Sequence, residues 1–500
     1  MLKINDLKII TNTGRKLVDG FSFVLNEGDK IALIGEEGNG KSTLLKIIAG
    51  VSDEEYVTYS GSVYCDEKIG YLPQRLSDED LQKDVLSYIG DPIDYNELYQ
   101  IINRIGIDDE LLQERTMSSL SGGERVKIAL AKILYDGADI LLLDEPSNDL
   151  DLKTLIWLEQ FILNTSLPLI FVSHDETLLE NCANGILHLE QLKRKTECSL
   201  TYESLGYRQY LESRNSFITR NNMIASKQRA QLQKQLDRWR TLYQKVEHRQ
   251  NTISRGDPHG GQLLKKKMKN LKSQERNLQQ QKENMRKTFE PEEAIDIFFE
   301  DVKLNPDKVI LDLHLKELRA GDKLLVKDLD LKILGRDKVC IIGDNGTGKT
   351  TLLKAIYERL KDRDDIRAGY MPQTYQELLD YEKKPLDFLW DRRSVDERKR
   401  IQTFLGTLKF TSEEMEHRIS ELSEGQKCKI LLAKMILEKK DVLILDEPSR
   451  NLSPLSNPQL RKILSDFKGC IIAVSHDRKF ISEAADKIYE LSDRRLSLLE

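Results

Sequence analysis

The stretch GEEGNGKST at residues 35–43 decides the fold of this chain. It follows a short apolar run, IALIG (31–35), and precedes LLKIIAG (44–50), whose apolar residues recur with helical spacing. A GxxxxGK[ST] loop between a buried strand and a helix surrounds phosphate groups with backbone N–H donors. The same pattern returns as GDNGTGKTT at residues 343–351. The sequence therefore predicts two phosphate-binding loops.

Four further motifs recur in the same order after each loop. They are YLPQ (71–74) and YMPQ (370–373), LSGGE (120–124) and LSEGQ (422–426), ILLLDEPS (140–147) and VLILDEPS (442–449), and VSHD (172–175) and VSHD (474–477). The repeat predicts two copies of one α/β domain, each with a mostly parallel sheet, because the motifs follow short apolar runs. We place the first domain at residues 1–204, a helical linker at 205–294 with its tip near 249–263, and the second domain at 295–500.

Composition indicates a soluble globular chain with one unusual segment. The 500 residues suit two or three domains, and no apolar run reaches the roughly 18 residues of a membrane span, which excludes a transporter with its own span. The six cysteines show no CxxC spacing, so we expect a reducing, cytoplasmic location and no zinc cluster. Net charge is −6, yet residues 211–290 hold 19 Lys and Arg against 7 Asp and Glu. A basic segment in an acidic chain points to nucleic acid.

The residue types in the two loops match the chemistry of a bound nucleotide. The glycines permit close approach of phosphate, the lysine meets the outer phosphates, and the following hydroxyl ligates Mg²⁺. The predicted ATP-binding residues of the loops are Gly35, Glu36, Glu37, Gly38, Asn39, Gly40, Lys41, Ser42 and Thr43, and then Gly343, Asp344, Asn345, Gly346, Thr347, Gly348, Lys349, Thr350 and Thr351. A glycine turn that serves packing alone does not account for two matches in register.

The apolar run that ends in Asp-Glu completes each predicted site. Glu145 and Glu447 are the predicted catalytic bases that polarise the attacking water, and His174 and His476 are predicted to bond the γ-phosphate. A lone histidine after a strand is more often structural, but two in one register favour the functional interpretation. The expected Mg²⁺ ligands, direct or through water, are Ser42, Gln74, Asp144, Thr350, Gln373 and Asp446.

With LSGGE, YLPQ, DEPS and SHD together, each copy resembles the nucleotide-binding domain of the ATP-binding cassette (ABC) family. The resemblance implies an ATPase whose two cassettes close head to tail around two ATP molecules, with a glutamine of each YxPQ motif also contacting nucleotide. The implied caps are Ser423, Glu424 and Gly425 over the ATP at Lys41, Ser121, Gly122 and Gly123 over the ATP at Lys349, and the glutamines are Gln74 and Gln373. Glu424 stands where glycine is usual. No aromatic residue for adenine lies at 10–14 or 318–321.

The central segment has the seven-residue spacing of long amphipathic helices. Its apolar positions are Ile218, Ala225, Leu232, Leu236, Trp239, Tyr243 and Val246, then Leu264, Met268, Leu271, Leu278 and Met285. NTISRGDPHGGQ (251–262) interrupts the pattern with glycine, proline and asparagine. These features predict an antiparallel helical hairpin.

Basic side chains and aromatics cluster beside the predicted bend. A spacer would mix both signs of charge, whereas this segment favours RNA contact, with Trp239, Tyr243 and His248 interleaved as possible stacking residues. A solvated spacer remains the alternative. The predicted RNA-binding residues are Arg238, Arg240, Tyr243, Lys245, Arg249, Ile253, Arg255, His259, Lys265, Lys266, Lys267 and Lys269.

Tandem cassettes, no membrane span and a basic hairpin together resemble the ABC-F family of translation factors. The resemblance implies a monomer without a permease partner that binds the E site of the 70S ribosome, with its linker near 23S rRNA, P-site tRNA and the peptidyl-transferase centre. The variant DEPSRNLSPLS (446–456) is similar to the subgroup that protects ribosomes from lincosamides, streptogramin A and pleuromutilins.

Three alternatives remain open on the sequence. A housekeeping ABC-F factor that assists stalled translation without conferring resistance is the competitor within the same family. The fused ATPase subunit of a sugar-type importer lacks a long basic hairpin. A DNA-repair or chromosome-organising ATPase places its coil inside a cassette, between the phosphate loop and LSGGE, rather than between two complete cassettes.

Overall fold

The computed structural model describes most of the chain and divides it into two compact units. The described residues are 1–51, 56–90, 95–108, 112, 115–192, 197–252, 258–285, 288, 289, 299, 302, 304–390 and 395–499. Unit 1 comprises residues 1–207 and 292–500, and unit 2 comprises residues 208–291. Each unit is considered by itself below.

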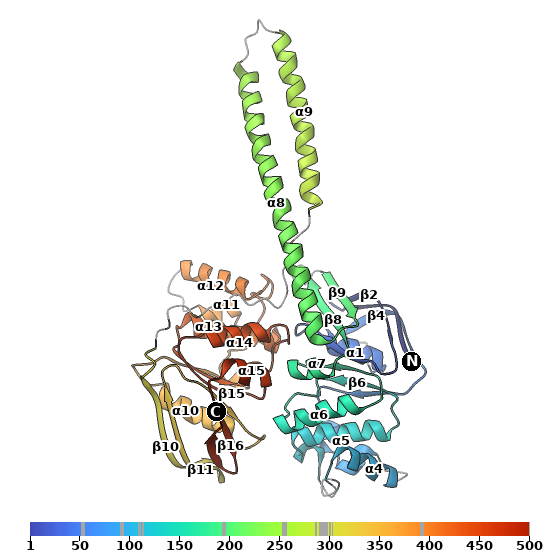
Figure 1. The fold of residues 1–500 in the computed structure, drawn as a ribbon, viewed down its shortest axis with the longest axis vertical. Helices are drawn as coiled ribbons and strands as arrows, with labels where there is room; N and C mark the ends of the chain where they lie inside the picture. The colour runs from blue at the N-terminus through green and yellow to red at the C-terminus, as the bar shows by residue number, and fades with distance from the viewer. Residues whose placement is uncertain are drawn as a thin grey trace. The chain divides into compact units, whose positions relative to one another are not determined.

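Unit 1 contains two cassettes of the same design (Figure 1), and the first is built on a six-stranded sheet. The strand order is β5 (Ile69–Leu72), β6 (Ile140–Asp144), β7 (Leu169–Val172), β3 (Lys30–Ile34), β8 (Gly185–Leu192) and β9 (Glu197–Glu203). All neighbours are parallel except β8 and β9. A separate antiparallel sheet contains β2 (Lys16–Leu25), β1 (Leu2–Thr11) and β4 (Val57–Cys65). The helices are α1 (Lys41–Ala49), α2 (Asp78–Gln82), α3 (Val85–Ile89), α4 (Tyr95–Ile105), α5 (Gly122–Tyr135), α6 (Leu152–Asn164) and α7 (Glu176–Cys182), with the 3₁₀ turn η2 (Met117–Ser119).

The second cassette repeats this arrangement. Its six-stranded sheet runs β13 (Ala368–Met371), β14 (Val442–Asp446), β15 (Cys470–Val474), β12 (Lys338–Ile342), β16 (Lys487–Ser492) and β17 (Arg495–Leu498). The hairpin of β10 (Val309–Ala320) and β11 (Lys323–Leu334) is its antiparallel part. The helices are α10 (Lys349–Leu360), α11 (Pro385–Leu389), α12 (Val395–Thr407), α13 (Glu424–Leu437), α14 (Asn457–Asp466) and α15 (Arg478–Ala484), with the turns η3 (Tyr375–Glu377) and η4 (Ile419–Glu421). The predicted α/β fold with two cassettes and a long helical linker is confirmed.

The apolar runs become the central strands because a parallel sheet covered on both faces requires continuous apolar sequence. Every residue of β6 and of β14 is buried. The carboxyl ends of parallel strands lie at one edge of a sheet, which is where ligands bind in such folds. The phosphate loop after β3, the Asp-Glu pair after β6 and the histidine after β7 therefore meet at that edge, and β12, β14 and β15 bring together the same set.

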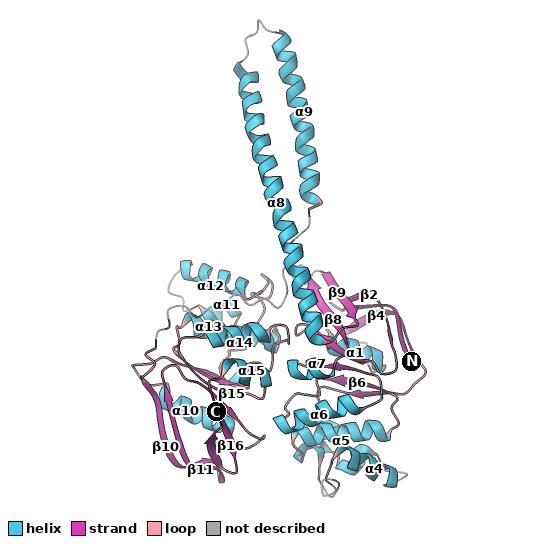
Figure 2. Ribbon diagram, viewed as in Figure 1, coloured by secondary structure: helices cyan, strands magenta, loops and turns pink. Residues whose placement is uncertain are grey.

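Unit 2 is a pair of long helices, α8 (Tyr207–Thr252) and α9 (Pro258–Glu283), drawn in cyan in Figure 2. The predicted apolar positions face inward: Ala225, Leu232 and Leu271 are buried, and the others are half-buried. Trp239 differs from our expectation of a free stacking residue. Its Nε1–H donates to the Leu271 carbonyl at 2.9 Å, because a half-buried indole needs an acceptor. Among the described residues, no helix is long and apolar enough to span a bilayer.

Candidate nucleotide sites and basic hairpin surface

The conformation of the first phosphate loop depends on glycine and on the lysine of the loop. Gly35 has φ 152°, and a Cβ there would lie 2.3 Å from the Leu189 carbonyl oxygen, so only glycine fits. Lys41 Nζ donates to the Gly35 and Glu36 carbonyls at 2.8 and 3.2 Å. The loop thus curls over the N-terminus of α1, where free N–H groups and the helix dipole favour an anion.

The second loop has the same geometry. Gly343 has φ 149°, and a Cβ would lie 2.4 Å from the Leu491 carbonyl oxygen. Lys349 Nζ donates to the Gly343 and Asp344 carbonyls at 2.8 and 2.9 Å. Burial lowers the pKa of Lys349, so the ammonium gains from any anion that enters this loop.

The predicted Mg²⁺ ligands at the first site lie within reach of one another. Ser42 Oγ donates to Asp144 Oδ1 at 3.0 Å, and Tyr71 donates to Asp144 Oδ2 at 3.3 Å. Gln74 instead donates its amide to Glu145 at 3.1 Å. Burial raises the pKa of Asp144, and the Ser42 hydrogen bond opposes that shift.

At the second site, the carboxylate of Asp446 has fewer hydrogen-bond donors around it than that of Asp144 has at the first site, which suits a cation. Both carboxylate oxygens of Asp446 are buried, and neither accepts a hydrogen bond within the geometric limits of a normal bond. Burial raises the pKa of Asp446, and the nearby Thr350 hydroxyl lowers it. Among the described residues no three His, Cys, Asp or Glu form a metal cage. Mg²⁺ requires no such cage, because it binds through one carboxylate, a hydroxyl, phosphate oxygens and water.

Glu145 and His174 form a buried ion pair at the first site. His174 Nε2 lies 3.0 Å from Glu145 Oε1, and Nδ1 lies 2.7 Å from the carbonyl oxygen of Leu452 in the second cassette. Burial raises the pKa of Glu145, but the charge and hydrogen bond of His174, together with Lys41 and Asn148, outweigh burial and lower that pKa to about 2. The pKa of His174 is raised by the same partner against the opposing effect of burial. A carbonyl and an ionised carboxylate can only accept, so both ring nitrogens donate and the imidazole is charged.

The corresponding pair at the second site is electrically different. The nearest ring nitrogen of His476 lies 3.7 Å from Glu447, whose other oxygen accepts the backbone N–H of His476 at 3.2 Å. Burial raises the pKa of Glu447 to about 8 and lowers the pKa of His476 to about 4. Both groups are therefore neutral at pH 7, and the two sites differ in protonation although their sequences match.

Both glutamates share one backbone conformation. Their φ values are 51° for Glu145 and 53° for Glu447, which lie in the left-handed region that non-glycine residues rarely adopt. Such strain persists where surrounding structure holds it, often at functional sites. The repeat at equivalent positions favours a functional origin.

Each LSGGE-type motif begins a helix. Ser121 is the N-cap of α5, and Ser423 is the N-cap of α13, each in a capping box with the side chain three residues later. The Glu424 side chain forms an ion pair with Lys427 of the same helix at 2.8 Å. The N–H of Gly425 donates at 2.5 Å to Glu37 of the first phosphate loop. This contact places the N-terminus of α13, which carries LSEGQ, directly beside the loop that contains Lys41.

Glu36 and Glu37 are functional candidates whose contacts we did not foresee. Ser456 Oγ donates to Glu36 at 2.8 Å, and Ser453 Oγ donates to the same carboxylate. Burial raises the pKa of Glu37, and the Gly425 N–H opposes it. The sequence did contain a signal for these contacts. Two adjacent acidic residues are unexpected in a loop that binds negatively charged phosphate.

A cavity of about 560 Å³ marks the second site. Its walls include Lys349, Thr350, Gln373, Asp446, Glu447 and His476, together with Ser147, Asn148, Asp149, His174 and Asp175 of the first cassette. Ser121, Gly122 and Gly123 are absent from the described residues that line it. Gly122 instead contacts the loop before α6: a Cβ there would lie 2.8 Å from the Asp149 carbonyl oxygen.

The side of this cavity toward β10 and β11 contains Ala320, Lys323 and Leu325, and no Phe, Tyr or Trp among the described residues that line it. The corresponding side of the first loop contains Arg15, whose Nη2 donates to the Gly38 carbonyl at 3.2 Å. Arg15 and Lys323 each precede by two residues the leucine that packs on a loop glycine. A basic residue therefore lies near each position where an aromatic residue commonly stacks on adenine. A search for aromatic residues alone does not detect it.

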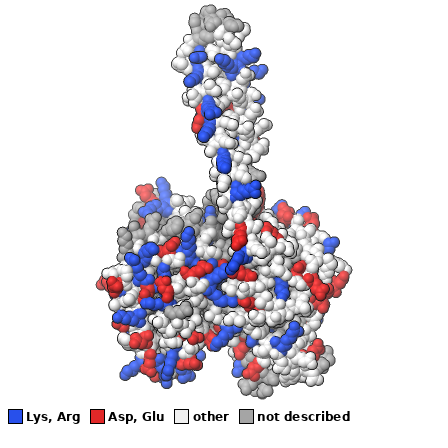
Figure 3. Space-filling model, in the orientation of Figure 1, with Lys and Arg blue, Asp and Glu red and all other residues white. Residues whose placement is uncertain are grey.

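The hairpin presents its basic residues to solvent. The exposed residues of our predicted RNA-binding set are Arg238, Arg240, Lys245, Arg249, Lys265, Lys266, Lys267 and Lys269. Figure 3 shows blue side chains gathered where α8 ends and α9 begins. Tyr243 is half-buried with its ring centroid 5.2 Å from that of Trp239. Ile253 and Arg255 lie outside the described residues, and so does the side chain of His259.

Two phosphate loops, each facing the other cassette, define this chain as an ATPase built from a pair of ATP-binding cassettes. The chain belongs to the ABC transporter family, whose sequence profile matches residues 18–148 and 326–450. The predicted ATPase is confirmed by that match.

Relatives of known sequence extend along nearly the whole chain. ABC transporter F family member 5 of Arabidopsis thaliana is 27% identical, with 96% of this chain and 73% of that protein aligned. The probable ATP-binding protein YheS of Escherichia coli (strain K12) is 26% identical over 96% of this chain and 77% of its own length. The ATP-binding protein Uup of Buchnera aphidicola subsp. Schizaphis graminum is 28% identical over 98% and 79%. The name of the first relative places that protein in the ABC transporter F family, which supports the ABC-F resemblance, and none of the three names mentions antibiotic resistance.

Solved structures confirm the fold. An archaeal ribosome recycling factor aABCE1, in complex with ribosomal stalk protein aP1, aligns with a TM-score of 0.60 and 18% identity over 95% of this chain and 86% of that chain. A structure described as RNase-L Inhibitor aligns with a TM-score of 0.57, also at 18% identity, over 95% and 86%. At this identity the similarity establishes the paired-cassette fold alone.

Proposed function

We propose that this chain is an ABC-F ATPase that binds the ribosome when ATP closes its cassettes and acts there through its basic hairpin. The exposed Lys and Arg cluster where α8 ends and α9 begins carries the proposal. A phosphate backbone is the partner that such a cluster fits, because binding releases condensed counterions. The cytoplasm is the expected location.

ATP is the substrate that links the cassettes in this proposal. Lys41 and Lys349 hold the outer phosphates, and the helix N-terminus at Gly425 completes the first site from the other cassette. Gly123 is not among the described residues that line the second cavity, so the N-terminus of α5 has to approach it when ATP closes the cassettes. Mg²⁺ held near Ser42 and near Thr350 neutralises phosphate charge. In the first site the Glu37 carboxylate has to leave Gly425 before phosphate takes its place.

The two glutamates then act from different starting points. Glu447 is protonated at rest, so it must lose that proton before it can accept one from water, and a cation held near Thr350 would favour this ionisation. Glu145 is already ionised but is held by His174, Gln74 and Asn148, the last at 2.5 Å. Hydrolysis at the first site therefore requires release of Glu145 from these partners.

The finer role we propose is protection of the peptidyl-transferase centre from lincosamides, streptogramin A and pleuromutilins, with E-site binding and contact to P-site tRNA and 23S rRNA. The divergent loop DEPSRNLSPLS (446–456) supports this proposal. Its Ser453 and Ser456 contact Glu36, so the departures from the repeat build a distinct cassette contact. A housekeeping role on stalled ribosomes is the second candidate, because the names of the relatives mention ATP binding and no antibiotic resistance.

Drug susceptibility with a hairpin variant separates these candidates. Expression of the intact chain in a sensitive bacterium should raise the inhibitory concentration of a lincosamide or pleuromutilin. Replacing Thr252–Gly261 with a short Gly-Ser turn should abolish that rise while ATP hydrolysis continues, because the cassettes and their loops are untouched. Unchanged inhibition by every drug class with the intact chain would favour the housekeeping role. Loss of hydrolysis together with protection would refute separate tasks for hairpin and cassettes.

A further inference from the structure

Two ion pairs that join the cassettes occupy corresponding positions but have opposite polarity. Residues of the two copies correspond at a spacing of 302 positions from the DEPS motif onward. By this spacing Glu159 corresponds to Arg461, and Glu176 corresponds to Arg478. The observed pairs are Glu176 with Arg461 and Glu159 with Arg478. We call these two contacts the crossed pairs.

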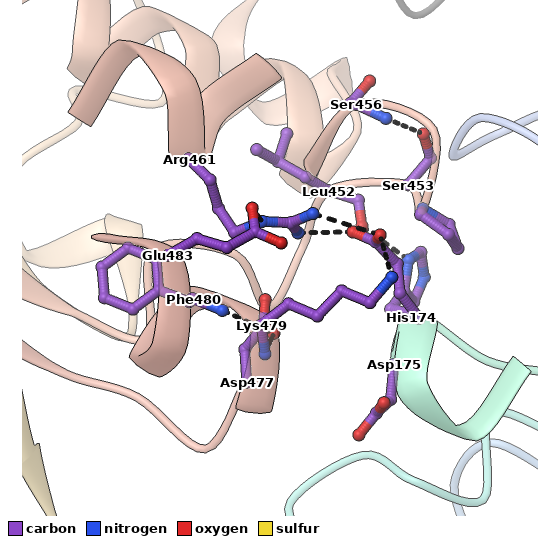
Figure 4. Close-up of polar contacts among 12 residues, drawn as sticks. His174, Asp175, Leu452, Ser453, Ser456, Arg461, Asp477, Lys479, Phe480 and Glu483 are labelled. Atoms are coloured by element: carbon purple, nitrogen blue, oxygen red, sulfur yellow. Dashed lines mark hydrogen bonds and ion pairs between the residues drawn. The ribbon is translucent and has the colours of Figure 1, made fainter. Parts of the chain in front are cut away.

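Both crossed pairs are well formed, and the pair of Glu176 with Arg461 is fully buried. The Arg461 guanidinium donates to both oxygens of Glu176 at 2.5 and 3.2 Å, and neither side chain is more than 3% exposed. Arg478 donates to Glu159 at 2.8 Å and is 22% exposed. Figure 4 shows Arg461 between Glu483 and the first-cassette helix that carries Glu176. Two-pronged arginine–carboxylate contacts are both strong and geometrically selective.

Each pair also has a supporting residue, and these too occupy corresponding positions. Asn181 donates its amide to Glu159 at 2.8 Å. Glu483, at the equivalent place in the second cassette, accepts from Arg461 Nε at 2.7 Å. The supporting residue is thus a donor where the charge is negative and an acceptor where it is positive. The inversion of charge extends to the neighbours that orient each side chain.

Three further ion pairs between the cassettes have the same polarity as the crossed pairs. Lys479 of α15 reaches Glu176 at 3.4 Å and Glu180 at 2.5 Å in the first cassette. Arg478 additionally approaches Asp175 at 3.4 Å. Among the described residues of this cluster, each side chain that pairs across the cassettes is acidic on the first cassette and basic on the second.

The consequence concerns which cassettes can pair. If two first cassettes met in the same head-to-tail manner, Glu159 of one would face Glu176 of the other at both places. Two second cassettes would bring Arg461 against Arg478 twice. A buried charge without a counterion is strongly unfavourable, and like charges in contact add to that cost.

We propose that the crossed pairs are a pairing code, which lets the first cassette accept the second and reject a copy of itself. The code operates without nucleotide, since none of its members lies in a phosphate loop. Discrimination of this kind requires a repulsive element against the wrong partner as well as attraction for the right one. Here one arrangement supplies both, and it is independent of any role on the ribosome.

The test uses full-length chains with inverted charges and no nucleotide. One variant, Glu159→Arg/Glu176→Arg, makes the contact wholly basic, and another, Arg461→Glu/Arg478→Glu, makes it wholly acidic. The combination of all four substitutions restores opposite charges with inverted polarity. Sedimentation reports the oligomeric state, and urea titration reports the unfolding midpoint. A control chain carries Glu27→Arg/Asp78→Arg, which changes two exposed acids away from the contact.

The wild-type chain and the control should sediment as monomers with the same midpoint. Each double variant should unfold at lower urea, and the fourfold variant should recover most of that loss as a monomer. An equimolar mixture of the two double variants should form a one-to-one dimer, because each basic first cassette finds an acidic second cassette in the other chain. Recovery in either experiment supports the code. Double variants that match the wild type, or failure of both recoveries, would overturn it.

Discussion

Replacing each of the two catalytic-site glutamates with glutamine should change the stability of the nucleotide-free chain in opposite directions. The substitutions are Glu145→Gln and Glu447→Gln, at equivalent places with the same backbone conformation. Glutamine keeps the shape and removes the charge. The difference follows from the partners: Glu145 faces a charged His174 at 3.0 Å, whereas Glu447 is buried beside a neutral His476.

The magnitudes follow from the shifts in pKa. A carboxyl whose pKa falls from 4.5 to about 2 on folding stabilises the native state above pH 4.5, and this contribution disappears as pH falls toward 2. At about 1.4 kcal/mol per pKa unit, Glu145 contributes roughly 3 kcal/mol at neutral pH, which Glu145→Gln should remove. It also leaves the charged His174 buried without its counterion, although the glutamine oxygen can still accept its N–H.

The sign is reversed for Glu447. A carboxyl whose pKa rises from 4.5 to about 8 binds more protons in the folded state, so its cost grows from pH 4.5 to pH 8. Glu447→Gln should therefore stabilise the chain by about 1 kcal/mol at pH 5.5 and about 4 kcal/mol at pH 7.5. The gain increases with pH, whereas the loss in Glu145→Gln is nearly constant over the same range.

The assay is the urea midpoint of each nucleotide-free variant at pH 5.5 and pH 7.5, with wild type alongside. A lower midpoint for Glu145→Gln at both pH values, and a higher one for Glu447→Gln mainly at pH 7.5, are the expected results. Equal shifts of the same sign in the two variants would refute the difference in protonation between the sites.

Two further predictions concern the first phosphate loop and the hairpin. Glu37→Asn copies the residue that the second loop has at the same place, Asn345, and removes a carboxylate that competes with phosphate for the Gly425 N–H. It should tighten binding of a fluorescent ATP analogue about tenfold, the equivalent of about 1.4 kcal/mol, and unchanged or weaker binding would contradict the competition. Replacing the three lysines at 265–267 with glutamine should lower the slope of log affinity for ribosomes against log salt by about 2, as three lost phosphate contacts predict. The matched control replaces three exposed cassette lysines, Lys3, Lys332 and Lys399. Equal slopes for the two triple variants would argue against RNA contact by the hairpin.

Much of the fold was predictable from the sequence, because each motif directly follows or begins a strand or helix whose residues have a recognisable local pattern. The apolar runs before GEEGNGKST and DEPS became β3 and β6, and LSGGE became a helix start capped by Ser121. The heptad spacing likewise predicted the hairpin, since residues such as Ala225 and Leu271 pack between its helices. These features depend on neighbours close in sequence.

The electrostatic state of the sites was not predictable from the same motifs. DEPS and VSHD occur in both cassettes, yet His174 is charged and His476 is neutral. The cause lies in how closely each pair packs: His174 Nε2 lies 3.0 Å from Glu145 while its Nδ1 lies 2.7 Å from the distant Leu452 carbonyl, whereas His476 lies 3.7 Å from Glu447 and burial lowers its pKa. Contacts of Trp239 with Leu271 and of Glu37 with Gly425 were missed for the same reason. A sequence motif does not show which residues of the opposite cassette, or of the neighbouring helix, contact it.

Co-sedimentation of Glu145→Gln/Glu447→Gln with 70S ribosomes tests the central claim most directly. This variant binds ATP but lacks both proposed bases, so closed cassettes should persist and the chain should pellet with ribosomes when ATP is present. It should remain in the supernatant without ATP, and replacing Thr252–Gly261 with a short turn should weaken the pelleting. A variant that stays in the supernatant with and without ATP would contradict ribosome binding by the closed cassettes.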